Sequence, residues 1–99
     1  MVYKEFKVDS QLKDEITDGV VVFYFYTPTC GRCKMQKNIF EKFKDKDFKI
    51  VCIDAVELRE VAFKYKVLSA PHCFIYRDKE IVFNGGFLSK TVLENILNQ

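Results

Sequence analysis

The sequence predicts an α/β protein, in which a central mixed sheet of about five strands is flanked by four helices. Three observations lead to this fold class. Residues 20–26 form an apolar run without alternation, which is typical of a strand covered on both faces. Strand-like and helix-like patterns alternate along the chain in the order β-α-β-α-β-α-β-β-α. Two short strands near the C-terminus are joined by a polar turn, which adds antiparallel edges.

The N-terminal elements precede the central strand. Residues 3–8 alternate weakly between apolar and polar side chains, and this predicts a short strand. Asp9 or Ser10 would then cap a helix that runs to about Thr17 and ends at Gly19. These elements lead directly into the apolar run.

The middle of the chain adds two helices and a strand. After a turn at residues 27–29, the hydrophobic period becomes helical from Cys30. Residues 48–54 predict a second apolar strand, and residues 58–65 predict another amphipathic helix. In the helix that starts at Cys30, the side chains expected to face the core are Met35, Ile39, Phe40 and Phe43.

The last third of the chain predicts a hairpin followed by a helix. Residues 73–76 and 80–83 are apolar strands on either side of a polar turn. Two glycines at 85–86 interrupt the strand pattern, and Ser89 then caps the final helix. Strands separated by helices are expected to pair in parallel through right-handed crossovers. In the final helix, the side chains expected to face inward are Val92, Leu93, Ile96 and Leu97.

Composition narrows the class of protein. A chain of 99 residues with 48% hydrophobic residues is expected to fold as one domain, residues 1–99. A net charge of +2 argues against a nucleic-acid partner, and 15% aromatic residues argue against disorder. No apolar run is long enough to cross a membrane, and the first residues lack the pattern of a signal peptide. We therefore expect a monomer in the cytoplasm, with no membrane contact.

Two of the four cysteines are close in sequence, as Cys30-Gly31-Arg32-Cys33, between a buried strand and a helix. The unpaired N–H groups of a helix start favour a thiolate at the first cysteine. Arg32 adds a cation beside the motif, and Gly31 leaves the approach to Cys30 open. The second cysteine is one turn along, so it can close a disulfide and resolve a mixed disulfide with a substrate.

The remaining chemistry-bearing residues allow more than one interpretation. A zinc site would need two more ligands, whereas Cys52 and Cys73 are 21 residues apart. These two cysteines are expected to act as small buried hydrophobes, and no metal or other cofactor is predicted. Pro71 either starts a strand in the trans form or turns the backbone sharply in the cis form, which would expose the amide and carbonyl of Ala70. His72 either lines the active-site rim or is an ordinary surface residue.

Three segments resemble the thioredoxin family. Residues 20–35 resemble its second strand and active-site helix, whose usual motif is Trp-Cys-Gly-Pro-Cys-Lys. Residues 65–71 resemble the approach to the family's cis proline, and residues 85–89 resemble the start of its last helix. The resemblance implies a nucleophilic Cys30, a resolving Cys33 and a cis Pro71 beside them. It also implies a groove for an extended substrate, formed by Ala70, Pro71, His72 and Gly86.

Departures from the family pattern mark an atypical site. Thr29 stands where the family has tryptophan, and Arg32 stands where it has proline. The buried aspartate six residues before the first cysteine is replaced by Tyr24, and the lysine that accompanies it by Cys52. The missing carboxylate predicts slow resolution of the mixed disulfide, because the buried thiol of Cys33 must lose a proton.

The resemblance implies a thiol–disulfide oxidoreductase that acts on protein disulfides and is reduced by a disulfide reductase. An alternative is a peptide-binding module that keeps the groove beside Pro71 without catalysis. A glutaredoxin-like protein and a metal or iron–sulfur carrier are further alternatives. The additional strand and helix that precede residue 20 favour a thioredoxin-like over a glutaredoxin-like architecture, since glutaredoxins begin at the strand that carries the active site.

Overall fold

The fold was analysed in a computed structural model, which describes residues 1–7 and 11–99. The expected caps Asp9 and Ser10, and the expected end of the first strand, lie outside the described residues. The described strands form one five-stranded sheet in the order β1-β3-β2-β4-β5. Their bounds are β1 Val2–Glu5, β2 Val20–Tyr26, β3 Lys49–Asp54, β4 His72–Arg77 and β5 Glu80–Gly85.

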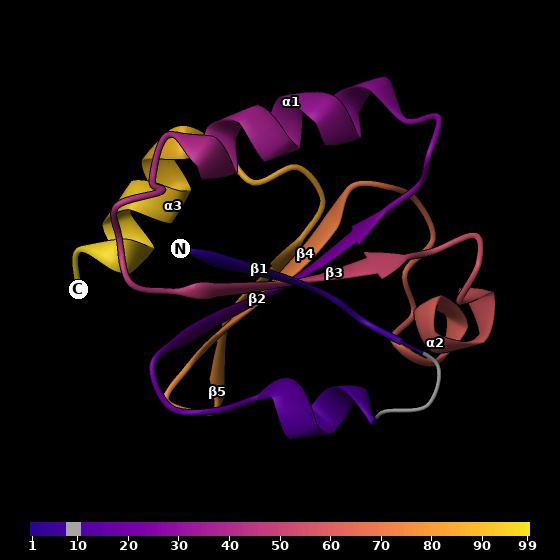
Figure 1. The fold of residues 1–99 in the computed structure, drawn as a ribbon, viewed down its shortest axis with the longest axis horizontal. Coiled ribbons are helices and arrows are strands. Elements are labelled where there is room, and N and C mark those ends of the chain that lie inside the picture. Colours follow the sequence, from indigo (N-terminus) through magenta and orange to yellow (C-terminus); the bar gives the residue numbers. More distant parts are fainter. Residues whose placement is uncertain (8–10) are drawn as a thin grey trace.

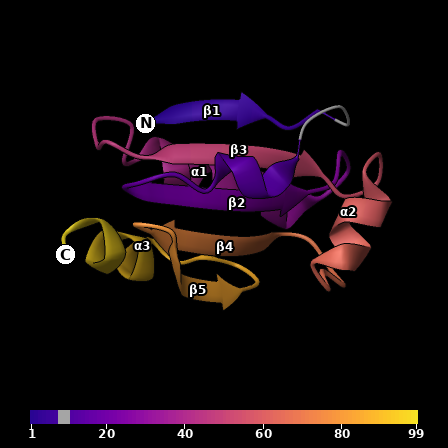
Figure 2. The same ribbon diagram turned by 90° about the horizontal axis from the view of Figure 1, so that it is seen from below.

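The sheet is mixed, as predicted. β3 pairs in parallel with both β1 and β2, whereas β4 pairs antiparallel with β2 and with β5. The helices are α1 (Gly31–Glu41), α2 (Arg59–Lys64) and α3 (Lys90–Leu97), and a short 3₁₀ helix spans Leu12–Glu15. Figures 1 and 2 show α1 and α3 over one face of the sheet, and the 3₁₀ helix and α2 over the other. Each face therefore has its own hydrophobic core.

The helix expected to run to Thr17 is instead a single 3₁₀ turn, so three α-helices and this turn replace the four expected helices within the described part of the chain. Leu12 and Glu15 are the buried residues of the turn, and their spacing of three matches the 3₁₀ period. The chain then leaves helical geometry at Ile16. Gly19 ends the connection with a φ of +84°, a conformation that glycine adopts without steric cost.

The buried face of α1 agrees with the predicted one only in part. Phe40 and Phe43 are buried as predicted, but Met35 is 58% exposed, and Cys33 and Gln36 face the sheet instead. Gln36 is fully buried because its side-chain amide satisfies the backbone of Leu88. Its Nε2 donates to the Leu88 carbonyl at 2.9 Å, and its Oε1 accepts from the Leu88 N–H at 2.7 Å. This pair of hydrogen bonds joins α1 to the segment that leads into α3.

The C-terminal third agrees with the sequence prediction in most respects. Asp78 and Lys79 have φ values of 49° and 73°, and such a pair of residues suits a tight hairpin turn between β4 and β5. Ser89 caps α3 by accepting the Val92 N–H at 3.2 Å. Val92 itself is 38% exposed, contrary to the expectation that it faces inward, because Leu93 and Ile96 form the buried stripe of α3.

None of the described helices is long and apolar enough to cross a bilayer.

Candidate active site

The two close cysteines lie where β2 gives way to α1. Cys30 is the N-cap of α1 and is partly buried, whereas Cys33 lies in the first turn and is only 4% exposed. Their sulfurs form a disulfide, with the Cα atoms 5.2 Å apart. The Cys33 N–H donates to the sulfur of Cys30 at 3.1 Å. After reduction, the same N–H group and the start of the helix favour a thiolate on Cys30.

The other residues of the motif are open to solvent or face the final loop. A methyl group added at Gly31 would meet no atom within 4 Å, so the approach to Cys30 is unobstructed on that side. The guanidinium of Arg32 lies over the ring of Phe87, 5.0 Å from its centroid. Arg32 therefore places its charge against the loop that leads into α3. Thr29 is exposed in the preceding turn.

The segment before β4 passes next to the disulfide. The peptide bond between Ala70 and Pro71 is cis, as the family resemblance implied. The Ala70 carbonyl oxygen is 3.7 Å from the sulfur of Cys30. Gly86 lies close to this turn, because a Cβ atom placed there would be 3.7 Å from the Pro71 carbonyl oxygen. The structure thus brings Ala70, Pro71 and Gly86 together beside the disulfide.

His72 lies on the other side of the sheet from Cys33. It pairs with Phe25 across β2 and β4, and its ring is 4.8 Å from that of Phe74. Its Nε2 is 2.8 Å from Oδ1 of Asn84 on β5. Phe25 and Phe74 belong to the core beneath α2. His72 is thus next to the groove in sequence, but its ring packs toward the opposite face.

A hollow with a volume of about 280 Å³ adjoins Ala70. It lies between the turn after β2, α2 and the segment that leads to Ala70, and its wall includes Thr27, Arg59 and Val67. Two large apolar side chains border it and stand clear of the core: Phe63 is 83% exposed and Leu68 is 94% exposed. An apolar surface therefore extends from the disulfide toward α2.

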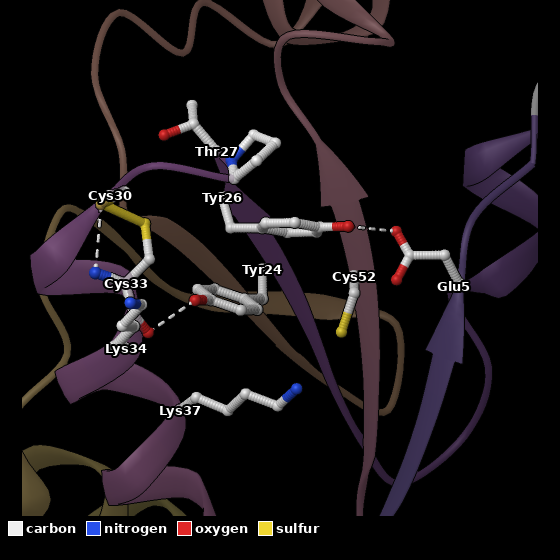
Figure 3. Close-up of a pocket in the computed structure, with 10 residues that line it drawn as sticks. Glu5, Tyr24, Tyr26, Thr27, Cys30, Cys33, Lys34, Lys37 and Cys52 are labelled. Carbon is white, nitrogen blue, oxygen red and sulfur yellow. Dashed lines mark hydrogen bonds between the residues drawn. A yellow bond between two sulfur atoms is a disulfide. The ribbon is translucent and has the colours of Figure 1, made fainter.

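Tyr24 lies beneath the first turn of α1. Its hydroxyl donates a hydrogen bond to the carbonyl of Cys33 at 2.8 Å, and its ring packs edge-on against Phe40 (Figure 3). Burial raises the pKa of the Tyr24 phenol far above its ordinary value. Tyr24 therefore fills the position of the family's aspartate without supplying a group that accepts protons at neutral pH.

The strand register places Tyr24 in a row of side chains that crosses the sheet. Glu5 pairs with Cys52, Cys52 with Tyr24, and Tyr24 with Cys73. Residues paired in this way point to the same face, which is the one that α1 covers. Burial raises the pKa of both free cysteines to about 12, so they are protonated and inert in the folded protein at neutral pH.

A second cavity, of about 220 Å³, lies on the inner side of Cys33 (Figure 3). Cys33, Tyr24 and Cys52 form part of its wall, together with the side chains of Glu5, Tyr26, Lys34 and Lys37. The Tyr26 hydroxyl donates to Oε2 of Glu5 at 2.7 Å. Sequence reasoning did not single out Glu5, Tyr26 or Lys37. The signal available for Glu5 was indirect, namely the expected parallel pairing of the first strand.

The described residues offer no cluster of metal ligands. Within residues 1–7 and 11–99, no three histidine, cysteine, aspartate or glutamate side chains come close enough together to hold a metal ion.

The sheet order, the cysteine pair at a helix start and the adjacent cis proline define the class of thiol–disulfide oxidoreductases that share this fold. The chain belongs to the thioredoxin family, because the family's sequence profile, described as "Thioredoxin", matches residues 2–99. It is 36% identical over 95 residues to the thioredoxin of Bacillus subtilis, covering 92% of this chain and 91% of that protein. It is 34% identical to the thioredoxin of Staphylococcus epidermidis, with the same coverage of both chains.

Solved structures agree on the fold. The oxidised mitochondrial thioredoxin 3 of Saccharomyces cerevisiae superimposes with a TM-score of 0.80 at 20% identity, over 97% of this chain and 93% of that one. The thioredoxin of Malassezia sympodialis gives a TM-score of 0.79 at 22% identity, over 100% of this chain and 90% of that one. The protein is a thiol–disulfide oxidoreductase of the thioredoxin type, with Cys-Gly-Arg-Cys as its motif.

Proposed function

We propose that the protein reduces disulfides of protein substrates, with Cys30 as the nucleophile and Cys33 as the resolving thiol. The observation that carries this assignment is the asymmetry of the pair. Cys30 is partly exposed at the N-cap and accepts an N–H hydrogen bond on its sulfur, whereas Cys33 is only 4% exposed. A substrate disulfide can therefore reach Cys30 and not Cys33.

The reaction proceeds in two exchanges. The Cys30 thiolate attacks one sulfur of the substrate, the substrate disulfide breaks, and its other sulfur leaves as a thiolate that takes up a proton. Cys33, after losing its proton, then attacks the Cys30 sulfur, so that the intramolecular disulfide forms and the second substrate thiolate is released. A disulfide reductase must supply two electrons to return the pair to the dithiol. The chain acts as one domain and as a monomer in this scheme.

The substrate segment is proposed to lie in the groove that Ala70, Pro71 and Gly86 form beside Cys30. The short distance of 3.7 Å from the Cys30 sulfur to the Ala70 carbonyl supports this placement, since an extended peptide there can bond to exposed backbone groups. Thr29 borders the groove and Gly31 keeps one side of it open, whereas His72 adjoins the groove only through its backbone, since its ring packs toward the opposite face. The apolar hollow next to Ala70 supports a protein substrate rather than a small polar disulfide.

Trapping of the mixed disulfide tests these roles. We expect Cys33→Ser to accumulate a covalent complex with a disulfide-containing protein such as insulin, and Cys30→Ser to form none. The parent protein should turn over repeatedly with dithiothreitol as reductant. A protein that bound extended peptides but left disulfides intact would support the alternative of a non-catalytic module. Equal trapping by both variants would contradict the assignment of roles.

A further inference from the structure

The exchange steps above do not involve the cavity that lies behind Cys33. Cys33 is 4% exposed, so the proton that its thiol loses during resolution cannot pass straight into bulk solvent. Its sulfur instead borders the cavity of about 220 Å³ (Figure 3). Since a water molecule occupies about 30 Å³, this volume can hold several of them. The cavity therefore offers a path for that proton.

Three other groups on the cavity wall do not accept the proton at neutral pH. The Tyr24 hydroxyl already donates its hydrogen to the Cys33 carbonyl, and burial keeps the phenol protonated by raising its pKa. The Cys52 thiol has a pKa raised to about 12, mainly by burial, so it is not an acceptor either. Tyr26 is excluded in the same way, because burial and its bond to Glu5 raise its pKa.

Glu5 has the geometry of an acceptor. Among the described residues, its carboxylate is the one that lines this cavity, and Oε2 is oriented by the Tyr26 hydroxyl at 2.7 Å. The register of β1 against β3 places Glu5 beside Cys52, on the face of the sheet that carries Tyr24. Glu5 is also exposed, so a proton that reaches it can pass on to solvent.

The cations of the cavity support the same direction of transfer. Lys34 and Lys37 reach it from α1, and Lys37 partly offsets burial and the Glu5 carboxylate, which both raise the pKa of Cys52. The two ammonium groups likewise offset part of the cost of an anionic sulfur on Cys33 during resolution. Asp54, from the end of β3, is the other carboxylate whose charge acts on Tyr26. It does not line the cavity.

We propose that Glu5, held by Tyr26, accepts the Cys33 proton through water in this cavity and so promotes resolution. This inference rests on the proposed roles of the two cysteines. The Cys33 S–H bond breaks as the Cys33–Cys30 bond forms and the bond from Cys30 to the substrate sulfur breaks. The proton goes to the Glu5 carboxylate and then to solvent, and the substrate leaves as its thiolate. No further oxidant or reductant takes part in this step.

Stopped-flow reaction of the reduced protein with an aromatic disulfide that releases a coloured thiolate separates the two exchanges. The first release reports attack by Cys30, and the second reports resolution by Cys33. For Glu5→Gln, which keeps an acceptor for the Tyr26 hydroxyl, we expect an unchanged first phase. The second phase should be roughly tenfold slower at neutral pH, the lower end of what a positioned base contributes. Glu94→Gln, the same charge change on exposed α3, is the matched control and should leave both phases unchanged.

Two readouts distinguish proton transfer from a structural role. In Glu5→Gln the second phase should rise about tenfold per pH unit around neutrality, whereas in the parent it should be nearly flat. Added imidazole, which can enter the cavity as a free base, should restore much of the lost rate. Tyr26→Phe should give a smaller loss, because the carboxylate remains but is no longer oriented, and this variant serves if Glu5→Gln does not fold.

The outcomes separate cleanly. An unchanged second phase in Glu5→Gln would overturn the proposal, and so would a slower phase with the pH profile of the parent and no rescue by imidazole. An absent first phase in the parent would instead overturn the proposed role of Cys30, on which the proposal for Glu5 depends.

Discussion

The Tyr24 hydroxyl donates to the Cys33 carbonyl at 2.8 Å, and this bond ties the first turn of α1 to the centre of the sheet. The side chain at this position therefore holds the backbone of Cys33, and its phenol stays protonated at neutral pH because burial raises its pKa. The family's aspartate position has become a structural one in this chain. With Glu5 as the proposed acceptor, support for Cys33 and proton acceptance lie on different residues.

This separation can be tested at Tyr24. We expect Tyr24→Phe to lower the free energy of unfolding by about 1 kcal/mol, because one buried hydrogen bond is lost. The rate of resolution at neutral pH should stay near that of the parent, since the phenol does not accept the proton. Urea unfolding and the stopped-flow assay measure the two quantities. A large fall in the resolution rate at unchanged stability would show that the hydroxyl acts in the chemistry.

Selective alkylation tests the asymmetry of the cysteine pair. When the reduced protein is treated with limiting iodoacetamide at mildly acidic pH, Cys30 should be modified first, because it is more exposed and its thiolate accepts the Cys33 N–H. Peptide mapping by mass spectrometry identifies the modified residue. Modification of Cys33 ahead of Cys30 would contradict the assignment.

Gln36 is predicted to be a major contributor to stability. Gln36→Ala removes both hydrogen bonds to Leu88 and leaves a buried N–H and a buried carbonyl without side-chain partners. We expect a loss of about 3 kcal/mol in the free energy of unfolding. Met35→Ala, one residue earlier and 58% exposed, should change it far less. Similar losses in the two variants would mean that the buried amide contributes little.

The salt bridges of Glu15 predict an acid-dependent loss of stability. Hydrogen bonding to Lys4, at 2.7 Å, lowers the pKa of Glu15 below its ordinary 4.5, and Lys49, at 3.2 Å, acts in the same direction. The stabilisation is thus complete above pH 4.5 and is lost as pH falls through the lower folded-state pKa. Glu15→Gln should flatten the fall in unfolding free energy over this range. Glu94→Gln should not, and a parallel fall in both variants would exclude Glu15 as the cause.

The exposed apolar pair beside the groove predicts a defect confined to protein substrates. Phe63→Ser and Leu68→Ser should raise the KM for a protein disulfide several-fold while leaving the reaction with a small aromatic disulfide unchanged. Val56→Ser is the matched control, because Val56 is 62% exposed but does not border the hollow next to Ala70. Equal effects on both substrates would place the change at the cysteines.

The sequence predicted the sheet, its mixed pairing and the cysteine pair, because apolar runs and the position of the motif are local signals. It placed Phe40 and Phe43 in the core correctly but misassigned Met35 and missed Gln36, since a period of four from Met35 was chosen and a fully buried glutamine gives no hydrophobic signal. It overestimated the first helix because capping residues do not reveal whether a turn continues. Glu5 was missed for another reason: it reaches the site through β1–β3 register, which local pattern does not encode.

The buried thiol of Cys73 can report how often the folded protein opens. Cys73 is completely shielded, so a thiol reagent reaches it only when the layers around it separate. In a variant whose active-site cysteines are both serine, the rate at which Cys73 reacts with the reagent would measure the frequency of these openings.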